Sequence, residues 1–218
     1  MNRIVKFLCA LAAAGAFGAP VAAKAPNPAP SVEKILAGEP ASAGIFAKRM
    51  EGSVWHLQSG VTCPAAYTNV NLWAVEIYEA NGFDVGCDYG RNGGDGKAVA
   101  KLTVFVIKAA DDDTVDSAFA RYQAEVKAEY PLAVVKSPAP DTGSFKAQAR
   151  SEAYEYQIAG HPAYGVLVVG LRDGWIVEIR GTRLLDAPDA AETAADDLKA
   201  IEEALLKSMA TISSEKAT

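Results

Sequence analysis

The sequence predicts an α+β fold in which a mainly antiparallel β-sheet packs against two main helices. Two observations favour this class: strand-like runs joined by hairpin-length turns, and two longer stretches of helical periodicity that alternate with the groups of strands. One disulfide is expected in addition. The helical spacing covers residues 114–130 and 189–210. Because the strands come in groups before and between these helices, they are expected to pair mainly with their chain neighbours.

Residues 1–23 have the three-part layout of a secretory signal peptide. Arg3 and Lys6 form a cationic start, an apolar stretch follows at residues 7–19, and small residues stand at a cleavage position. The apolar stretch is shorter than the about 20 strongly apolar residues that a membrane span requires. We therefore expect an exported protein, periplasmic or secreted, whose mature chain begins at Lys24 and has no transmembrane segment.

One domain is predicted over residues 31–213, between a flexible Ala/Pro-rich leader at 24–30 and a short tail at 214–218. The first 23 residues hold two of the 21 basic residues and none of the 27 acidic ones, so the formal charge of −6 becomes −8 after their removal. No cluster of Lys and Arg is visible. We expect no nucleic-acid partner, because phosphate binding needs a basic stripe.

The first part of the domain combines short helical pieces with strands. Ser31 can cap a short helix that ends at Gly38, and the apolar residues between 45 and 50 favour a second helical piece. Strands are predicted at residues 55–58, 70–78 and 83–89.

The Asn81-Gly82 dipeptide predicts a tight hairpin between the last two of these strands. With a two-residue loop, Tyr78 would face Val85. The same register would place Glu76 opposite Cys87.

The strand at residues 98–108 is apolar on both faces and is expected at the centre of the sheet. Asp113 is the expected N-cap of the helix that follows, and Pro131 ends it. Further strands are predicted at residues 133–136, 145–159, 164–171 and 175–182, the last two joined by an Asp-Gly turn. The final helix should bury Leu198, Ile201, Leu205 and Met209.

Cysteine count and compartment together predict a disulfide. Cys9 would leave with the signal peptide, and the remaining Cys63 and Cys87 would face an oxidising environment. A bond that closes a loop of about 25 residues stabilises a fold by about 3 kcal/mol. The spacing is far from Cys-x-x-Cys, which disfavours a redox pair.

The motifs give no catalytic, metal or cofactor site. The chain has two histidines, His56 in a predicted strand and His161 in a Gly-His-Pro turn, and neither accompanies a Gly-x-Ser-x-Gly motif. The acidic, Gly-rich loop at residues 88–97 lacks both the EF-hand pattern and the ending of a P-loop. We therefore expect no catalytic residues, no metal and no cofactor.

Aromatic residues provide the candidate ligand-binding group. Tyr154 and Tyr156 share one face of their strand, and Tyr164 and Trp175 stand at the start of the next two strands. Together with His161 they could line a cleft. The alternative is that they pack beneath the helices, since a tyrosine at the edge of a core can direct its hydroxyl to water or to the backbone.

Two stretches, Ser59-Gly60-Val61-Thr62-Cys63-Pro64 and Gly82-Phe83-Asp84-Val85-Gly86-Cys87-Asp88-Tyr89, resemble a pattern in a family of exported bacterial proteins. This resemblance implies that the two cysteines pair. The ending at residues 174–182 is similar in layout to the last part of the PsbP/Mog1-like α/β/α sandwiches. Members of that fold mostly act as accessory or binding proteins, so the resemblance implies no catalytic residue.

These observations together predict an exported, non-catalytic binding or accessory protein of the cell envelope. Its partner would be an envelope protein or a small ligand, and the sequence does not indicate an oligomeric state. Two alternatives stay open: a hydrolase or transferase with a site near His161, and a structural accessory subunit. A deep pocket that holds His161 and a carboxylate would favour the enzyme.

Overall fold

The computed structural model describes residues 30–49, 51–94, 96–137 and 139–212, and these form two antiparallel sheets and three α-helices. The helices are α2 (Val32–Gly38), α3 (Val115–Glu129) and α4 (Ala190–Thr211), with short 3-10 helices η1 (Pro40–Ser42) and η2 (Gly143–Phe145). The large sheet contains β4 (Ala66–Tyr67), β5 (Val70–Ile77), β6 (Asp84–Asn92), β7 (Ala98–Lys108), β8 (Val134–Lys136), β9 (Ala149–Ile158), β10 (His161–Arg172) and β11 (Trp175–Leu184). The small sheet contains β1 (Phe46–Lys48), β2 (Val54–His56) and β3 (Thr62–Cys63).

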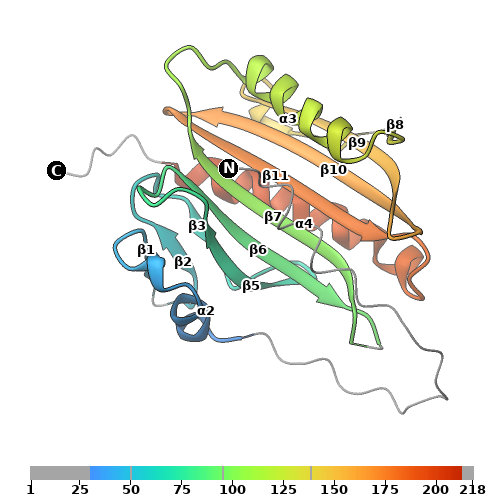
Figure 1. Ribbon diagram of the computed structural model, residues 1–218, viewed down its shortest axis with the longest axis horizontal. Coiled ribbons are helices and arrows are strands. Elements are labelled where there is room, and N and C mark those ends of the chain that lie inside the picture. The colour runs from blue at the N-terminus through green and yellow to red at the C-terminus, as the bar shows by residue number, and fades with distance from the viewer. Residues whose placement is uncertain (1–29, 50, 95, 138, 213–218) are drawn as a thin grey trace.

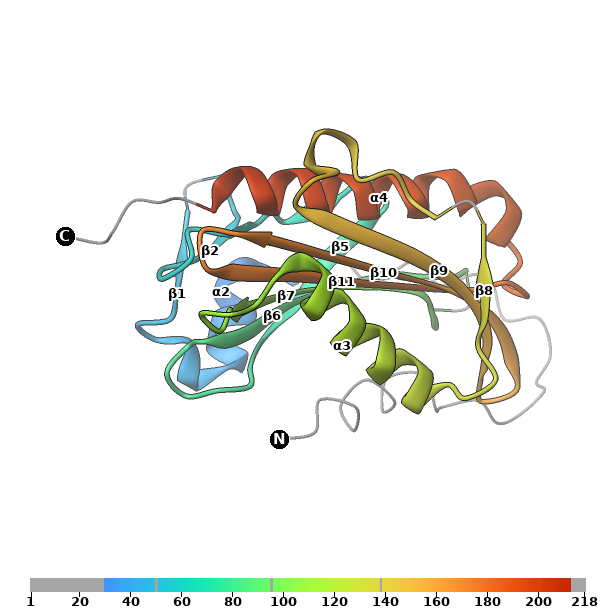
Figure 2. The same ribbon diagram turned by 90° about the horizontal axis from the view of Figure 1, so that it is seen from above.

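The large sheet has the strand order β4-β5-β6-β7-β11-β10-β9-β8, and every neighbouring pair is antiparallel. Helix α4 lies on one face of this sheet and α3 on the other (Figures 1 and 2). The predicted α+β class is confirmed, and β7 has the expected central position. The predicted signal peptide and tail lie outside the described residues, and the single domain over 31–213 stays a prediction.

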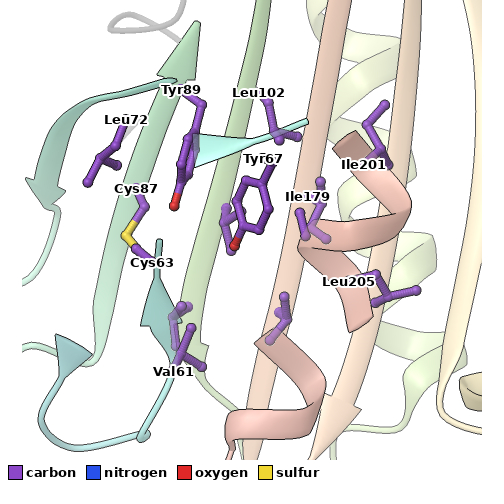
Figure 3. Close-up of a cluster of buried hydrophobic side chains, with 14 of the residues drawn as sticks. Val61, Cys63, Tyr67, Leu72, Cys87, Tyr89, Leu102, Ile179, Ile201 and Leu205 are labelled. Atoms are coloured by element: carbon purple, nitrogen blue, oxygen red, sulfur yellow. A yellow bond between two sulfur atoms is a disulfide. The ribbon is translucent and has the colours of Figure 1, made fainter. Parts of the chain in front are cut away.

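The α4 side of the sheet carries the larger core. Helix α4 buries Ile201, Leu205 and Met209 as its periodicity predicted, whereas Leu198 is partly exposed. These side chains pack with apolar residues of β6, β7 and β11, and the rings of Tyr67 and Tyr89 meet inside the same cluster (Figure 3). One long amphipathic helix therefore covers the centre of this face.

The α3 side is covered over a smaller area. Helix α3 packs on β9 and β10, where Ala118, Tyr122 and Val126 are buried. Thr114, not Asp113, is the N-cap: its hydroxyl accepts a hydrogen bond from the Ser117 N–H in a capping box. The prediction for Asp113 was wrong because its carboxylate instead accepts bonds from Arg121 and from the backbone before the helix.

The predicted helical piece at residues 45–50 is also wrong. Residues 46–48 form β1, which pairs with β2 so that Phe46 faces His56. Gly44 has a φ of +81°, which breaks a helical path, and the apolar side chains of Ile45 and Phe46 are buried in the core. The shorter helix α2 forms as expected, with the Ser31 hydroxyl accepting from the Lys34 N–H.

The hairpin between β5 and β6 differs from its predicted register by one residue. Val85 pairs with Ile77 rather than Tyr78, and Cys87 pairs with Val75 rather than Glu76. The connection is longer than two residues, because the N–H groups of Tyr78 and Glu79 both bond to the Asp84 carbonyl. A one-residue shift moves each predicted partner to the opposite face of the sheet.

The predicted disulfide joins the two sheets. Cys63 lies in β3 and Cys87 in β6, their Cα atoms are 6.4 Å apart, and both side chains are fully buried (Figure 3). Strand β3 belongs to the segment between β2 and β4. It approaches the large sheet on the face that α4 covers. The bond therefore fastens the small sheet and α2 to the main core.

Replacing both cysteines by serine should lower the free energy of unfolding by about 2–4 kcal/mol, because the unfolded chain gains conformational entropy when the cross-link is removed. Urea unfolding followed by circular dichroism measures this change. The far-ultraviolet spectrum should keep its shape. Thiol counting on the denatured, unreduced wild-type protein should find that neither of these two cysteines is free. Two reactive thiols in wild type would contradict the assignment.

Candidate functional site

The part of the large sheet that α3 leaves uncovered forms a hollow beside that helix. Two adjoining cavities lie along it, and both border Thr182 of β11. We call these two cavities together the α3-side groove. Its larger cavity has a volume of about 130 Å³, and its lining includes Trp73, Asp88, Val99, Lys101, Thr182 and Leu184.

Trp73 forms one wall of the larger cavity. The strand β5 has an irregular register between Leu72 and Ala74, next to this residue. The indole lies against Gly90 of β6 so closely that a Cβ at Gly90 would come within 2.2 Å of the ring. Gly90 is therefore required for the position of this wall, and a partly exposed indole beside an apolar cavity is suited to ligand contact.

A polar row forms the floor of the larger cavity, where Asp88 and Lys101 belong to the lining. Asp88 accepts a hydrogen bond of 2.6 Å from the Thr103 hydroxyl and lies 3.4 Å from the Lys101 ammonium. Thr103 is fully buried, and Lys101 and Asp88 are less than one-fifth exposed. These groups satisfy one another, so the floor is fixed before any ligand enters.

The smaller cavity, of about 20 Å³, lies under the C-terminal end of α3. Tyr130 and Tyr156 stack with ring centres 4.1 Å apart, and the Tyr156 hydroxyl lies 2.9 Å from that of Thr182. Tyr156 reaches Thr182 across Gly165, where a Cβ would come within 2.3 Å of the ring. Burial raises the pKa of the Tyr156 hydroxyl to about 12, so this group stays protonated.

Arg180 lies at the centre of an acidic cluster beside this cavity. Its guanidinium donates to Glu178 of its own strand and, at 2.7 Å, to Glu125 of α3. A carboxylate oxygen of Glu129 lies 3.8 Å from the guanidinium. Burial lowers the pKa of Arg180, but the neighbouring carboxylates outweigh it and leave the pKa raised. Three carboxylates thus surround one permanent cation.

The structure separates the predicted aromatic group. Tyr154 and Tyr156 lie together on the α3 face, where the Tyr154 hydroxyl donates to Glu152. Tyr164 and Trp175 belong to the core on the opposite face. Ligand binding by these residues as one group stays a prediction, and two of the five border the α3-side groove.

His161 lies at an exposed sheet end, 45% exposed, and its Nδ1 atom is 2.7 Å from a carboxylate oxygen of Asp186. This pair lies outside the lining of the α3-side groove.

Several residues in or beside the groove were not singled out from the sequence. Glu178 interrupts the apolar run at residues 175–179, and a charged residue between Val177 and Ile179 is a recognisable signal. Glu125 and Glu129 are four residues apart and therefore lie on one face of α3. Trp73 gave no signal, because the cavity beside it is formed by residues from four strands that are distant in the sequence.

His56 and Ser59 form a second polar pair, inside the core. The Nδ1 atom of His56 is 2.8 Å from the Ser59 hydroxyl, and both residues are buried. The imidazole packs against Phe46 and, edge to face, against Trp175. Burial lowers the pKa of His56 to about 4. With 1% of Ser59 exposed, this pair is closed to a substrate and acts in packing.

Among residues 30–49, 51–94, 96–137 and 139–212, no three His, Cys, Asp or Glu side chains are placed to hold a metal ion. In the same residues, no helix is long and apolar enough to span a membrane.

Comparison with known proteins found likeness in structure alone. No family model matches the chain, and no curated protein sequence matches it. One similar solved structure is that of LpqN, a protein involved in cell envelope biogenesis of Mycobacterium tuberculosis. The two sequences are 18% identical, the match covers 62% of this chain and 68% of the LpqN chain, and the TM-score is 0.33. The E65A mutant of the protein Mog1 is 12% identical over 78% of this chain and 96% of its own, with a TM-score of 0.40.

Stability should fall as the pH is lowered from about 6.5 to 4. In this range the unfolded His56 binds a proton that the folded, buried imidazole does not, so the unfolded state is favoured by up to about 3 kcal/mol. Urea unfolding at several pH values measures the effect. His56→Gln should flatten this pH dependence, and the matched change His161→Gln on the surface should preserve it. Equal slopes in all three proteins would contradict the buried, neutral histidine.

Proposed function

We propose that this chain is an exported, non-catalytic protein of the cell envelope that binds a small, partly apolar ligand in the α3-side groove. The observation that carries the proposal is the cavity of about 130 Å³ beside Trp73. An apolar wall with a few fixed polar groups is the usual composition of a small-molecule site.

The arrangement of charge and cover supports binding at this place. The floor residues Asp88, Thr103 and Lys101 are already paired, so a ligand meets a preformed surface. The opposite face of the sheet is covered by the long helix α4 and holds the larger core. Of these two faces, the α3 side has the cavity of about 130 Å³, whereas the cavity beneath α4 measures about 20 Å³.

Export is supported by the N-terminal sequence and by the disulfide. Residues 1–23 have the signal-peptide layout, and a buried disulfide is typical of proteins that fold outside the reducing cytoplasm. The same bond, with its fully buried sulfur atoms, suits a structural role better than redox exchange.

The binding proposal has more support than an enzyme centred on His161. The imidazole pairs with Asp186 on the surface, and Tyr154 and Tyr156 lie on the α3 face of the sheet while Tyr164 lies on the other. A catalytic site would need these groups within hydrogen-bond reach of one substrate. A purely structural subunit would not need a preformed cavity.

Filling the larger cavity should abolish binding. In wild type, the neutral probe 1-hexanol should shift the NMR resonances of the Trp73 indole N–H and the Val99 methyl groups. Val99→Phe places a ring in the cavity and should reduce that affinity at least tenfold, because the ring takes the probe's space. Val135→Phe, the same change at a half-exposed position of β8, is the control and should bind as wild type. Saturable binding that survives in Val99→Phe would place the ligand elsewhere.

Processing gives an independent test of export. The mature protein recovered from outside the cytoplasm should have an intact mass that corresponds to residues 24–218, with one disulfide. A mature, exported protein that retains Met1 would contradict the signal-peptide assignment.

A further inference from the structure

The smaller cavity of the groove is bordered by a buried carboxylate, and one of its oxygens accepts no hydrogen bond within the described residues. The Glu129 side chain is 3% exposed, and its Oε1 atom has no hydrogen-bond partner within the described residues. The Tyr130 hydroxyl interacts with the same carboxylate, which adds to the burial that raises the pKa of Tyr130. The residue lines the cavity that Tyr130, Tyr156 and Arg180 also border. A buried acceptor left unpaired costs about 1–3 kcal/mol, and a charged one costs more. A ligand that donates to this atom would recover that energy.

The charge of the surroundings favours a cation over a neutral donor. Glu125, Glu129 and Glu178 provide three carboxylates around the one guanidinium of Arg180. In a site with little water, a positive group is strongly attracted to neighbouring carboxylates. The aromatic rings of Tyr130 and Tyr156 at the same cavity are also compatible with a cation.

The size of the cavity selects the kind of cation. A volume of about 20 Å³ accommodates one group of the size of a water molecule. A primary ammonium group meets this limit and can donate three hydrogen bonds. A guanidinium or a trimethylammonium group is too large for it.

We propose that the α3-side groove binds an aliphatic primary amine, with the ammonium group at Glu129 and the carbon chain in the apolar cavity beside Trp73. This inference rests on the proposed function and names its ligand class. Both cavities border Thr182, so a short chain can extend from one to the other. The Tyr156 and Thr182 hydroxyls lie at this junction and are already bonded to each other.

The test compares three probes on the same protein by NMR titration at pH 7: hexylamine, 1-hexanol and hexyltrimethylammonium. In wild type, hexylamine should bind at least tenfold more tightly than 1-hexanol and should shift the amide of Glu129 as well as the Trp73 indole. Hexyltrimethylammonium should show no such advantage. This comparison needs no variant, so it holds even if a substitution affects folding.

Glu129→Gln should remove most of the preference for the amine while preserving 1-hexanol binding, because Gln has the same shape without the charge. Asp116→Asn, the same kind of change in the first turn of α3, is the control and should keep the preference. If 1-hexanol binds and hexylamine has no advantage, the ammonium site is wrong and the binding groove stands. If neither compound shifts any groove resonance, the proposed function fails together with this inference.

Discussion

The contact between Arg180 and the carboxylates around it connects the two elements that shape the groove. Arg180 belongs to β11 at the centre of the large sheet, and Glu125 and Glu129 belong to α3. The other contacts between α3 and the sheet are apolar packing and polar pairs with β9, such as Asp116 with Arg150 and Gln123 with Glu152. The cluster places the end of α3 next to β11 and thereby forms the smaller cavity.

Buried ion pairs are a weak source of stability, because removing charges from water costs several kcal/mol for each. A core of apolar residues could hold α3 at least as well. Binding of a positively charged ligand therefore explains these carboxylates, including the Glu129 oxygen that accepts no hydrogen bond, better than a contribution to stability does. The disulfide and the long helix α4, both on the other side of the sheet, provide the stability that this arrangement does not.

Patterns within one element predicted the fold well, and contacts between distant elements account for the errors. The apolar repeat of α4 and the two-sided apolar run of β7 are local and gave the correct helix and the correct central strand. The register at Cys87 depends on the length of a loop whose Gly82 packs against Ile45 and Gln58. Nothing local to Asn81-Gly82 carries that information.

The candidate site was predictable only in part for the same reason. Strand alternation correctly placed Tyr154 and Tyr156 on one face. The opposite placement of Tyr164 follows from its register with Glu155 and Arg183, which requires the strand order. Trp73 and Glu129 become site residues because α3 covers part of the sheet and ends beside β11, a property of tertiary packing.

A crystal structure of the protein with hexylamine would show whether the ammonium group binds at Glu129. We predict electron density for one molecule in the groove, with its nitrogen atom within hydrogen-bond distance of Glu129 Oε1 and its carbon chain against the Trp73 indole. An isolated water molecule at Glu129, with the amine bound elsewhere or absent, would contradict the proposed ammonium site.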